Sequence, residues 1–302
     1  MNLIKKIKNV YNTIKSINKR FGEANIRFAE ANKRIDEIER QMNISTRCIS
    51  DIQGKMGILE SYGVFLERND VNDNFAFSQA GEDMILSFVF EQLKIDPKDI
   101  SYLDLGANRP KKWSNTYYFY RKGARGVLVE ANPALISELK FFRNKDVVLN
   151  KCISDKSKEV IEFYVMSSPG LSSASKSSID EFLQIDPELK LRRTIKIETI
   201  TVSDIIEQYF TDAPTLLSID IEGKEEDVLH TIDFNKCRPL AIICETITYR
   251  PQHMETIGIT NHKVKDVMKN ADYVEYAFTG INSIFLDKHY IDNVVSITEE
   301  IA

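Results

Sequence analysis

Apolar side chains recur through the first 60 residues at alternating spacings of four and three. Leu3, Ile7, Val10 and Ile14 begin the series, and Ser45 is its one polar exception. A repeat of this kind, sustained over about eight heptads, predicts a long α-helical coiled coil. β-branched residues at both core positions favour a trimer over a dimer. We therefore expect residues 1–62 to be an oligomerisation segment, with copies of the chain joined through residues 1–60.

The pattern changes after a glycine-containing and polar stretch, residues 63–76, which we interpret as a linker. From residue 77 to residue 302, apolar runs of strand length alternate with amphipathic stretches of helix length. Such alternation is typical of an α/β domain with a doubly wound, mostly parallel sheet. The expected strands are 101–105, 126–130, 147–149, 161–165, 194–199, 215–220, 240–245, 273–277 and 282–286, and the expected helices begin near residues 79, 114, 133, 203, 224 and 261.

The formal net charge of −5 combines two parts of opposite sign. Residues 1–60 carry +5, and the remainder of the chain carries −10. An acidic chain argues against binding to nucleic acid, because that function usually requires a basic surface. Residues 1–20 hold six basic and no acidic side chains, so they could also lie as an amphipathic helix on anionic lipid.

The location of the protein follows from two further absences in the sequence. No apolar run reaches the roughly 18 residues that cross a membrane. The first residues also lack the apolar core and cleavage site of a signal peptide. We expect a cytoplasmic protein, with peripheral membrane contact through residues 1–20 as an additional option.

Four of the expected strands end on a carboxylate, namely Asp104, Glu130, Asp220 and Glu245. Doubly wound sheets bind ligands beyond the carboxyl ends of their strands, so these side chains indicate a charged or hydroxyl-rich ligand. Gly106 follows the first strand, but the second and third glycines of a dinucleotide-binding loop are missing. A cofactor with ribose and adenine but no phosphate fits this pattern better, and S-adenosylmethionine is the common one.

Six motifs, in order along the chain, resemble those of the FkbM-type methyltransferase family. The motifs are FSQAGEDMIL (77–86), YLDLGANRP (102–110), SNTYYFYRKGARGVLVEANP (114–133), LLSIDIEGKEEDVL (216–229), RPLAIICETITY (238–249) and NSIFLDK (282–288). The resemblance spans residues 77–288 and leaves out the coiled coil. It implies a Rossmann-like class I methyltransferase fold over residues 77–302 and S-adenosylmethionine-dependent methyl transfer to a hydroxyl oxygen.

The resemblance also implies a cofactor site. Pro110 departs from the family's commoner G-A-N-x-G form, so Ser114 and Asn115 become candidates for holding the methionine end. The family places the helix that begins near Gln79 over the pocket and the residues after the third strand beside adenine. The implied cofactor-binding residues are Gln79, Glu82, Asp83, Asp104, Gly106, Ala107, Asn108, Ser114, Asn115, Glu130, Ala131, Asn132, Ser154, Asp155 and Asp220.

A general base is needed to take the proton of an attacking hydroxyl. The candidates are Asp220, Glu222, Glu245 and His253, with Asp220 first because it ends the central strand. The three carboxylates could also hold Mg²⁺, but the sequence shows no further spaced ligand, so we do not favour a metal. The serine-rich stretch 167–178 could be an acceptor-side lid or only a long loop.

The acceptor is expected to be a saccharide, such as a surface polysaccharide or its precursor, on the habit of the family and the polar pocket. A small secondary metabolite or a lipid is the alternative acceptor. A catalytically inactive coiled-coil scaffold with a methyltransferase fold is the alternative class of protein. The joint presence of Asp104, Glu130, Asp220 and Glu245 argues against an inactive scaffold.

Deleting residues 1–60 tests the predicted oligomerisation segment. We expect the full chain to form an oligomer, a trimer by preference, and the shortened chain to be a monomer, because the heptad core is removed. Light scattering coupled to size-exclusion chromatography gives both masses. An unchanged oligomer in the shortened chain would show that another surface joins the copies.

Overall fold

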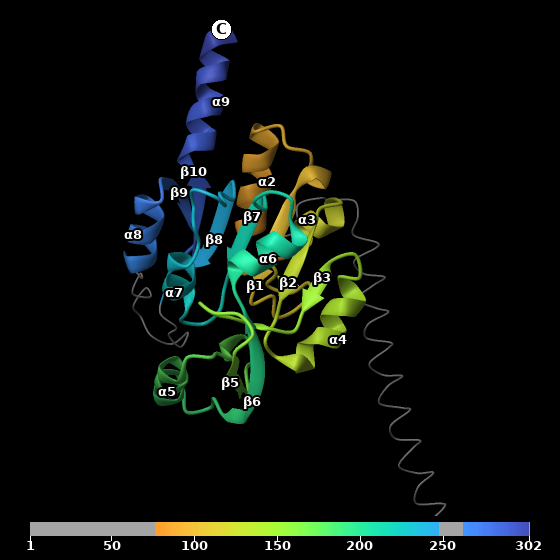
Figure 1. Cartoon of the computed structure of the whole chain (residues 1–302), viewed down its shortest axis with the longest axis vertical. Helices are drawn as coiled ribbons and strands as arrows, with labels where there is room; N and C mark the ends of the chain where they lie inside the picture. The colour runs from red at the N-terminus through yellow and green to blue at the C-terminus, as the bar shows by residue number, and fades with distance from the viewer. Residues whose placement is uncertain (1–75, 248–261, 302) are drawn as a thin grey trace, which may run out of the picture. The chain divides into compact units, whose positions relative to one another are not determined.

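A computed structural model places the carboxyl-terminal part of the chain as a seven-stranded sheet with helices on both faces (Figure 1). The structure describes residues 76–247 and 262–301. The predicted coiled coil and almost all of the linker lie outside the described residues, and they remain predictions. All described residues belong to one unit, Asn74–Ala302.

The strand order of the main sheet is β3-β2-β1-β7-β8-β10-β9. Five neighbouring strands are parallel, whereas β10 runs antiparallel to both β8 and β9. The chain builds outward from β1 to β3, then returns to the other side of β1, so the switch point of the sheet lies between β1 and β7. The bounds are β1 (Ser101–Leu105), β2 (Arg125–Val129), β3 (Val147–Leu149), β7 (Leu216–Ile219), β8 (Ala241–Glu245), β9 (Tyr273–Phe278) and β10 (Asn282–Asp287).

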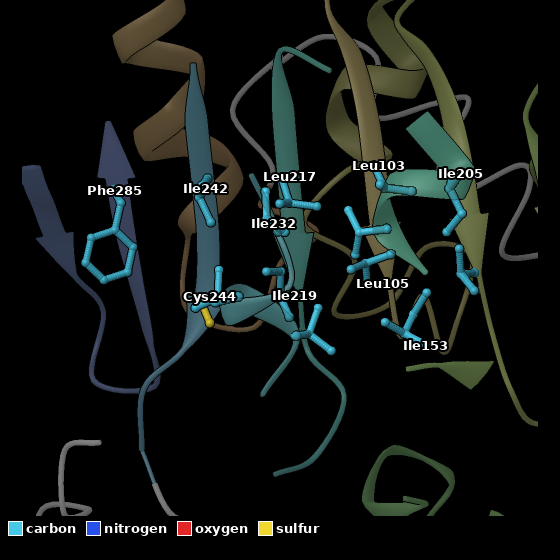
Figure 2. Close-up of a cluster of buried hydrophobic side chains, with 14 of the residues drawn as sticks. Leu103, Leu105, Ile153, Ile205, Leu217, Ile219, Ile232, Ile242, Cys244 and Phe285 are labelled. Atoms are coloured by element: carbon cyan, nitrogen blue, oxygen red, sulfur yellow. The ribbon is translucent and has the colours of Figure 1, made fainter. Parts of the chain in front are cut away.

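Alternate residues of each central strand face two separate cores. Leu105, Ile219 and Cys244 belong to the core drawn in Figure 2 and are fully buried. This face is covered by α6 (Val202–Tyr209), α7 (Glu225–His230) and α8 (His262–Asn270). The opposite face packs against α2 (Glu82–Gln92), α3 (Tyr117–Lys122), α4 (Pro133–Phe142) and α9 (Lys288–Ile301). Strands buried on both faces explain the nearly continuous apolar runs of the sequence.

Two of the expected strands do not join the main sheet, contrary to the prediction of one open sheet. β5 (Val160–Met166) and β6 (Leu191–Ile200) pair antiparallel, and β6 also pairs with the short β4 (Cys152–Ile153) in a second, three-stranded sheet. The sequence of β6 alternates Ile195, Lys196, Ile197 and Glu198, which suits a strand that buries only one face.

The described helices differ from the prediction mainly where polar side chains set their first turns. α2 begins at Glu82 rather than Gln79, because Ser78 and Asp83 bond each other and the backbone ahead of the helix. α3 begins at Tyr117, whose N–H donates to Ser114 Oγ. The stretch 167–178 is not a plain loop, since it contains the short helix η2 (Pro169–Leu171) and the start of α5 (Lys176–Ile185). Neither α5, α9, β4 nor the 3-10 helix η1 (Pro97–Asp99) was expected.

The loops after β1 and β7 cross in close contact at the switch point. Gly106 has a φ of +81°, and a Cβ atom at this position would collide with the carbonyl oxygen of Asp220. The Asp220 N–H also donates to the carbonyl of Leu105 at 3.0 Å. Only glycine therefore permits the two strand ends to approach this closely.

Replacing Gly106 with alanine should destabilise the fold by about 2–5 kcal/mol. A left-handed backbone costs a residue with a side chain about 1–2 kcal/mol, and overpacking adds about 1–3 kcal/mol. Gly280→Ala is the matched control, because Gly280 has a φ of +94° but open space around the added Cβ. Urea unfolding of both variants measures the difference. Equal losses would show that the crossing of the loops tolerates a side chain.

Candidate functional site

A cavity lies beyond the carboxyl ends of β1, β2 and β7. It contains about 540 Å³ of space, partly open to solvent. One wall comes from the loops of the main sheet and the other from the small sheet and η2. The lining residues are Gly106, Asn108, Val129, Glu130, Ala131, Lys151, Cys152, Ile153, Phe163, Pro169, Gly170, Ser172, Ala174, Asp220, Ile221, Glu222 and Lys224.

Glu130 follows β2 and is held by backbone donors on both sides. Its Oε2 accepts from the N–H of Asn108 at 2.9 Å, and its Oε1 accepts from the N–H of Asn132 at 2.6 Å. Burial raises the pKa of Glu130 to about 7, although these two hydrogen bonds oppose the rise. The carboxylate is therefore fixed in orientation while its remaining lone pairs can accept from hydroxyl groups in the cavity.

Asn108 has an unusual backbone and an unused side-chain oxygen. Its φ of +46° places it in the left-handed region, which asparagine tolerates better than most residues. Among the described residues, no hydrogen-bond donor contacts its buried Oδ1. An unsatisfied acceptor at the wall of a cavity indicates a ligand that donates a hydrogen bond there.

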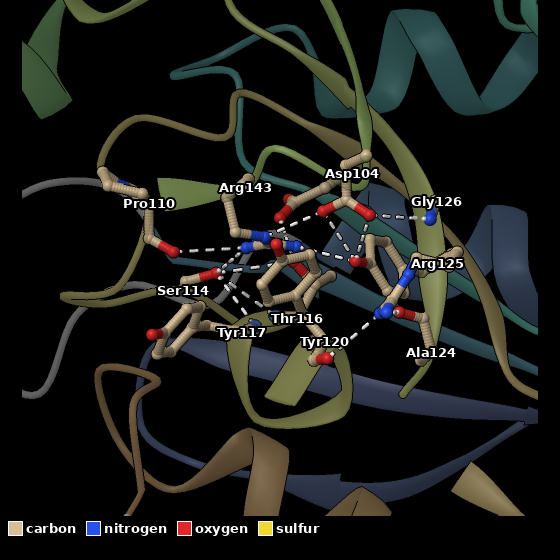
Figure 3. A network of polar contacts seen from close by, with 12 residues as sticks. Asp104, Pro110, Ser114, Thr116, Tyr117, Tyr120, Ala124, Arg125, Gly126 and Arg143 are labelled. Carbon is tan, nitrogen blue, oxygen red and sulfur yellow. Dashed lines mark hydrogen bonds and ion pairs between the residues drawn. The ribbon is translucent and has the colours of Figure 1, made fainter. Parts of the chain in front are cut away.

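Asp104 lies behind the cavity, within a buried network centred on Arg143 (Figure 3). Asp104 accepts from Thr116 Oγ1 at 2.7 Å, and Thr116 in turn accepts from Arg143 Nη2 at 3.0 Å. Burial raises the pKa of Asp104, while the Thr116 hydroxyl and the Arg143 charge lower it. The network supports the strand end from which the cofactor loop leaves.

The Arg143 guanidinium is 1% exposed and has partners on several sides. Its Nε donates to Asp146 at 2.8 Å, and its Nη2 donates to the hydroxyl of Tyr102 at 3.0 Å. Its Nη1 bonds the Pro110 carbonyl and Ser114 Oγ. Arg143 therefore ties the end of α4 to the loop between β1 and α3. The sequence analysis missed it, because only its spacing of three from Asp146 signals a pair.

Three carboxylates gather at the ends of β7 and β8. One oxygen from each of Asp220, Glu222 and Glu245 lies within 4.8 Å of the others. Burial, followed by the neighbouring charges of Glu225, Asp104 and Glu130, raises the pKa of Asp220 to about 7. Burial and the neighbouring carboxylates also raise the pKa values of Glu222 and Glu245.

Glu222 is held in place through its backbone. Its φ of +59° is strained for a residue with a side chain. The carbonyl oxygen of Glu222 accepts from Ser173 Oγ at 2.8 Å, and Ser173 is fully buried in the cover formed by the small sheet. This single bond connects the cover to the acidic loop after β7.

Part of the predicted site lies at the cavity. Six predicted residues line it, namely Gly106, Asn108, Glu130, Ala131, Asp220 and Glu222. Glu245 joins the carboxylate cluster beside it. His253 lies outside the described residues, and its predicted role stays a prediction.

Other predicted cofactor residues lie elsewhere and have structural partners. Gln79 is exposed before α2, whereas Glu82 and Asp83 are buried and anchor that helix. Ala107 is packed in the core, and Asn132 caps α4.

The cavity-lining residues do not include Ser114, Asn115, Ser154 or Asp155. Ser114 Oγ accepts from the N–H of Tyr117 at the start of α3, and Asn115 donates to Ser218. Ser154 donates to Asp155. Their roles in cofactor binding stay predictions. Motif position fixes a residue in the chain but not the direction of its side chain.

Sequence reasoning missed the contribution of the small sheet. Phe163 from β5 and Pro169, Gly170, Ser172 and Ala174 from the following segment line the cavity. The serine-rich composition of 167–178 was the available signal, because it had suggested a lid beside the acceptor. The structure places this segment over the same cavity as Glu130 and Asn108.

The sheet order and the cavity at its switch point define a Rossmann-like class I methyltransferase fold. The model of the methyltransferase FkbM domain matches residues 104–275, which is more than half of the chain. The chain belongs to this family and is an S-adenosylmethionine-dependent methyltransferase. A search of curated protein sequences returned no match. None of the described helices is long and apolar enough to cross a membrane.

Solved structures of methyltransferases are similar to this chain at low sequence identity. A TehB-like SAM-dependent methyltransferase from Corynebacterium glutamicum has a TM-score of 0.36 at 11% identity, with 76% of this chain and 97% of that chain covered. A putative caffeoyl-CoA O-methyltransferase from Staphylococcus aureus has a TM-score of 0.37 at 10% identity, covering 74% and 91%. An O-methyltransferase from Bacillus cereus in complex with SAH has a TM-score of 0.35 at 10% identity, covering 75% and 89%.

The cavity residues fit S-adenosylmethionine. Glu130 can accept from the ribose hydroxyls, and the free Oδ1 of Asn108 can accept from an N–H of the cofactor. Gly106 lets the backbone of the loop approach the ligand. Asp220 and Glu222 give this wall of the cavity negative charge, which suits the positive sulfonium.

The affinity for S-adenosylhomocysteine should rise as the pH increases from 6 to 8. The raised pKa of Glu130 leaves it largely protonated at pH 6 and ionised at pH 8, and the ionised form is the better acceptor for ribose. Glu130→Gln should bind about tenfold more weakly at pH 8, since one buried hydrogen-bond partner is worth about 1–3 kcal/mol. It should also show a shallower pH dependence. Calorimetry measures both effects. S-adenosylhomocysteine is the suitable ligand because it lacks the sulfonium charge, which would complicate the comparison.

The exposed carboxylate of Asp180 on α5 provides the control for this measurement. Asp180→Asn should keep the affinity and pH dependence of the parent chain. If Glu130→Gln behaves in the same way, Glu130 does not hold the ribose.

Proposed function

We propose that this methyltransferase transfers its methyl group to a hydroxyl oxygen of a saccharide. The observation that carries the proposal is the carboxylate cluster Asp220, Glu222 and Glu245, which adjoins the cofactor cavity through Asp220 and Glu222. A hydroxyl is a weak nucleophile that must lose its proton as it attacks. The cluster supplies a proton acceptor at the place where the acceptor substrate would meet the cofactor.

The pKa of the side chain that accepts the proton matters for this chemistry. General bases work best when their pKa lies near the operating pH. The pKa of Asp220 is raised to about 7, mainly by burial and then by neighbouring carboxylates. An ordinary aspartate would be too weak a base to help at neutral pH. Asp220 is therefore the preferred base, and burial together with the charges of Glu225, Asp104 and Glu130 raises its pKa.

S-adenosylmethionine supplies an electrophilic methyl carbon bound to a positive sulfur. With the cofactor bound, Asp220 would take the proton of the attacking hydroxyl as the methyl group is transferred, and that proton would then pass to solvent. The cavity residues contribute by holding the cofactor in one position, which removes much of the entropic cost of aligning the two reactants. The small sheet and η2 form the wall of the cavity opposite the loops of the main sheet.

The polar character of the site favours a saccharide over a lipid. Carboxylates accept hydrogen bonds from hydroxyl groups, and a sugar offers several of them in a fixed arrangement. An acyl chain would find carboxylates rather than apolar side chains at the cluster. A small polyhydroxylated metabolite would satisfy the same groups, so it remains the alternative that an acceptor screen has to separate.

A methyl-transfer screen with nucleotide sugars, glycan fragments, phenolic metabolites and lipids tests the acceptor class. We expect radiolabel from the methyl donor to appear in the saccharide pools, with no consumption of the donor beyond background in the others. Transfer only to phenolic or lipid acceptors would contradict the saccharide proposal. Tight cofactor binding without transfer to any acceptor would favour an inactive scaffold.

Asp220→Asn tests the base. Loss of a general base should lower kcat by about 10²- to 10⁴-fold, while the affinity for S-adenosylhomocysteine changes little because the side chain keeps its shape. Asp180→Asn again serves as the control, with kcat expected to match that of the parent chain. A kcat within threefold of the parent in Asp220→Asn would assign the base to another group.

A further inference from the structure

The carboxylate cluster has no compensating partner in the part of the chain that the structure describes. Within the described residues, no hydrogen bond and no cation acts on the side chains of Asp220, Glu222 or Glu245. The charged groups that act on Glu222 and Glu245 there are all carboxylates. The three residues are partly exposed, and like charges placed this close together without donors or cations repel one another, so the cluster suits a positive ligand.

The cofactor alone does not account for the whole cluster. Asp220 and Glu222 line the cavity, whereas Glu245 at the end of β8 is not among its lining residues. Glu245 lies on the side of the cluster toward β10, because its register partner on that strand is Asn282. A ligand on this side would contact Glu245 without occupying the cofactor cavity.

Asn282 provides a second and independent observation. Its side chain is 3% exposed, and among the described residues no donor contacts its buried Oδ1. Its Nδ2 donates to Glu82 Oε1 at 2.8 Å, which fixes the orientation of the amide because a carboxylate can only accept. An amide oxygen that is buried, oriented and without a donor is available to a cation.

The strand alternation directs Asn282 toward the cluster. Ile284 of β10 and Ile243 of β8 belong to the same core on the α2 face of the sheet. Counting two residues along each strand places Asn282 and Glu245 on that same face. Directly opposed residues of antiparallel strands have Cβ atoms about 4.5–5.5 Å apart. The register therefore places the Asn282 and Glu245 side chains next to each other on the same face of the sheet.

We propose that Asp220, Glu222, Glu245 and Asn282 Oδ1 form a binding site for a divalent cation such as Mg²⁺ or Mn²⁺. The four groups are hard oxygen ligands, which suit these ions rather than zinc or copper. An octahedral ion has six positions, so two stay open for water or for hydroxyl oxygens of the acceptor. Asn282 is the fourth ligand that the spacing of the sequence did not reveal.

The role of the cation rests on the proposed function, but its binding does not. With two open positions beside the cofactor cavity, the ion would hold adjacent hydroxyls of a sugar and lower the pKa of the one that attacks. The proton of that hydroxyl would still pass to Asp220, through the carboxylate oxygen that does not bind the ion, and then to solvent. A cation at this site would thus select acceptors that have two neighbouring oxygen atoms.

Binding of Mn²⁺ to the full-length chain, freed of metal with a chelator, tests the site. The electron paramagnetic resonance signal of free Mn²⁺ falls as the ion is bound. We expect one Mn²⁺ per chain, with binding retained when S-adenosylhomocysteine is saturating, because the cation and the cofactor occupy different positions. Glu245→Gln and Asn282→Ala should each weaken Mn²⁺ binding at least tenfold, whereas Asp180→Asn should leave it unchanged.

Thermal unfolding provides a second measurement that separates the site from a structural role. Without metal, Glu245→Gln should unfold at a higher temperature than the parent, because it removes one of the repelling charges. Addition of Mn²⁺ should raise the unfolding temperature of the parent and of Asp180→Asn but not that of Glu245→Gln.

Failure of binding to the parent chain at millimolar Mn²⁺, or equal binding by Glu245→Gln, would overturn the site. Either result leaves methyl transfer to a hydroxyl intact, since the screen described above does not depend on Mn²⁺ binding. An absence of transfer to every acceptor, by contrast, would refute the proposed function while the Mn²⁺ titration stands on its own.

Discussion

The close crossing of the loops after β1 and β7 is the constraint on which the site depends. Gly106 leaves room for the carbonyl of Asp220, and the Asp220 N–H bonds the end of β1. This contact brings the cofactor loop and the acidic loop together at the switch point of the sheet. A side chain at residue 106 would separate them, and Glu130 and Asp220 would then no longer face one cavity. One missing Cβ atom therefore sets the distance between the loop after β1 and the acidic loop after β7.

The molecule buries carboxylates in two contrasting ways. Asp104 and Asp146 surround Arg143, whose guanidinium offers enough donors to satisfy the Tyr102 and Thr116 hydroxyls as well. That group of charges is complete, and it fixes the loop between β1 and α3. The cluster of Asp220, Glu222 and Glu245 has no such partner among the described residues. Arg143 compensates the charges of Asp104 and Asp146. The repulsion among the three carboxylates of the cluster is instead relieved by proton uptake or by a ligand.

The sequence was most informative where a pattern repeats along the chain. Apolar runs located all nine expected strands, and the acidic strand ends located Glu130 and Asp220 at the cavity. The small sheet was placed wrongly, because partner choice between strands depends on contacts distant in sequence. The direction of side chains at Ser114, Asn115 and Asp83 was missed for a related reason, since local hydrogen bonds to Arg143, Ser218 and Ser78 decide it. The motif NSIFLDK includes Asn282, but the motif does not show that this residue lies opposite Glu245 or that its Oδ1 has no donor among the described residues. Both features require the pairing of β10 with β8.

The bond between Ser173 and the carbonyl of Glu222 makes the cover and the acidic loop one mechanical unit. Any displacement of Ser173 away from the acidic loop must break this bond or pull on the strained backbone of Glu222. The segment that lines one wall of the cavity and the loop that carries Asp220 and Glu222 therefore share one anchor point.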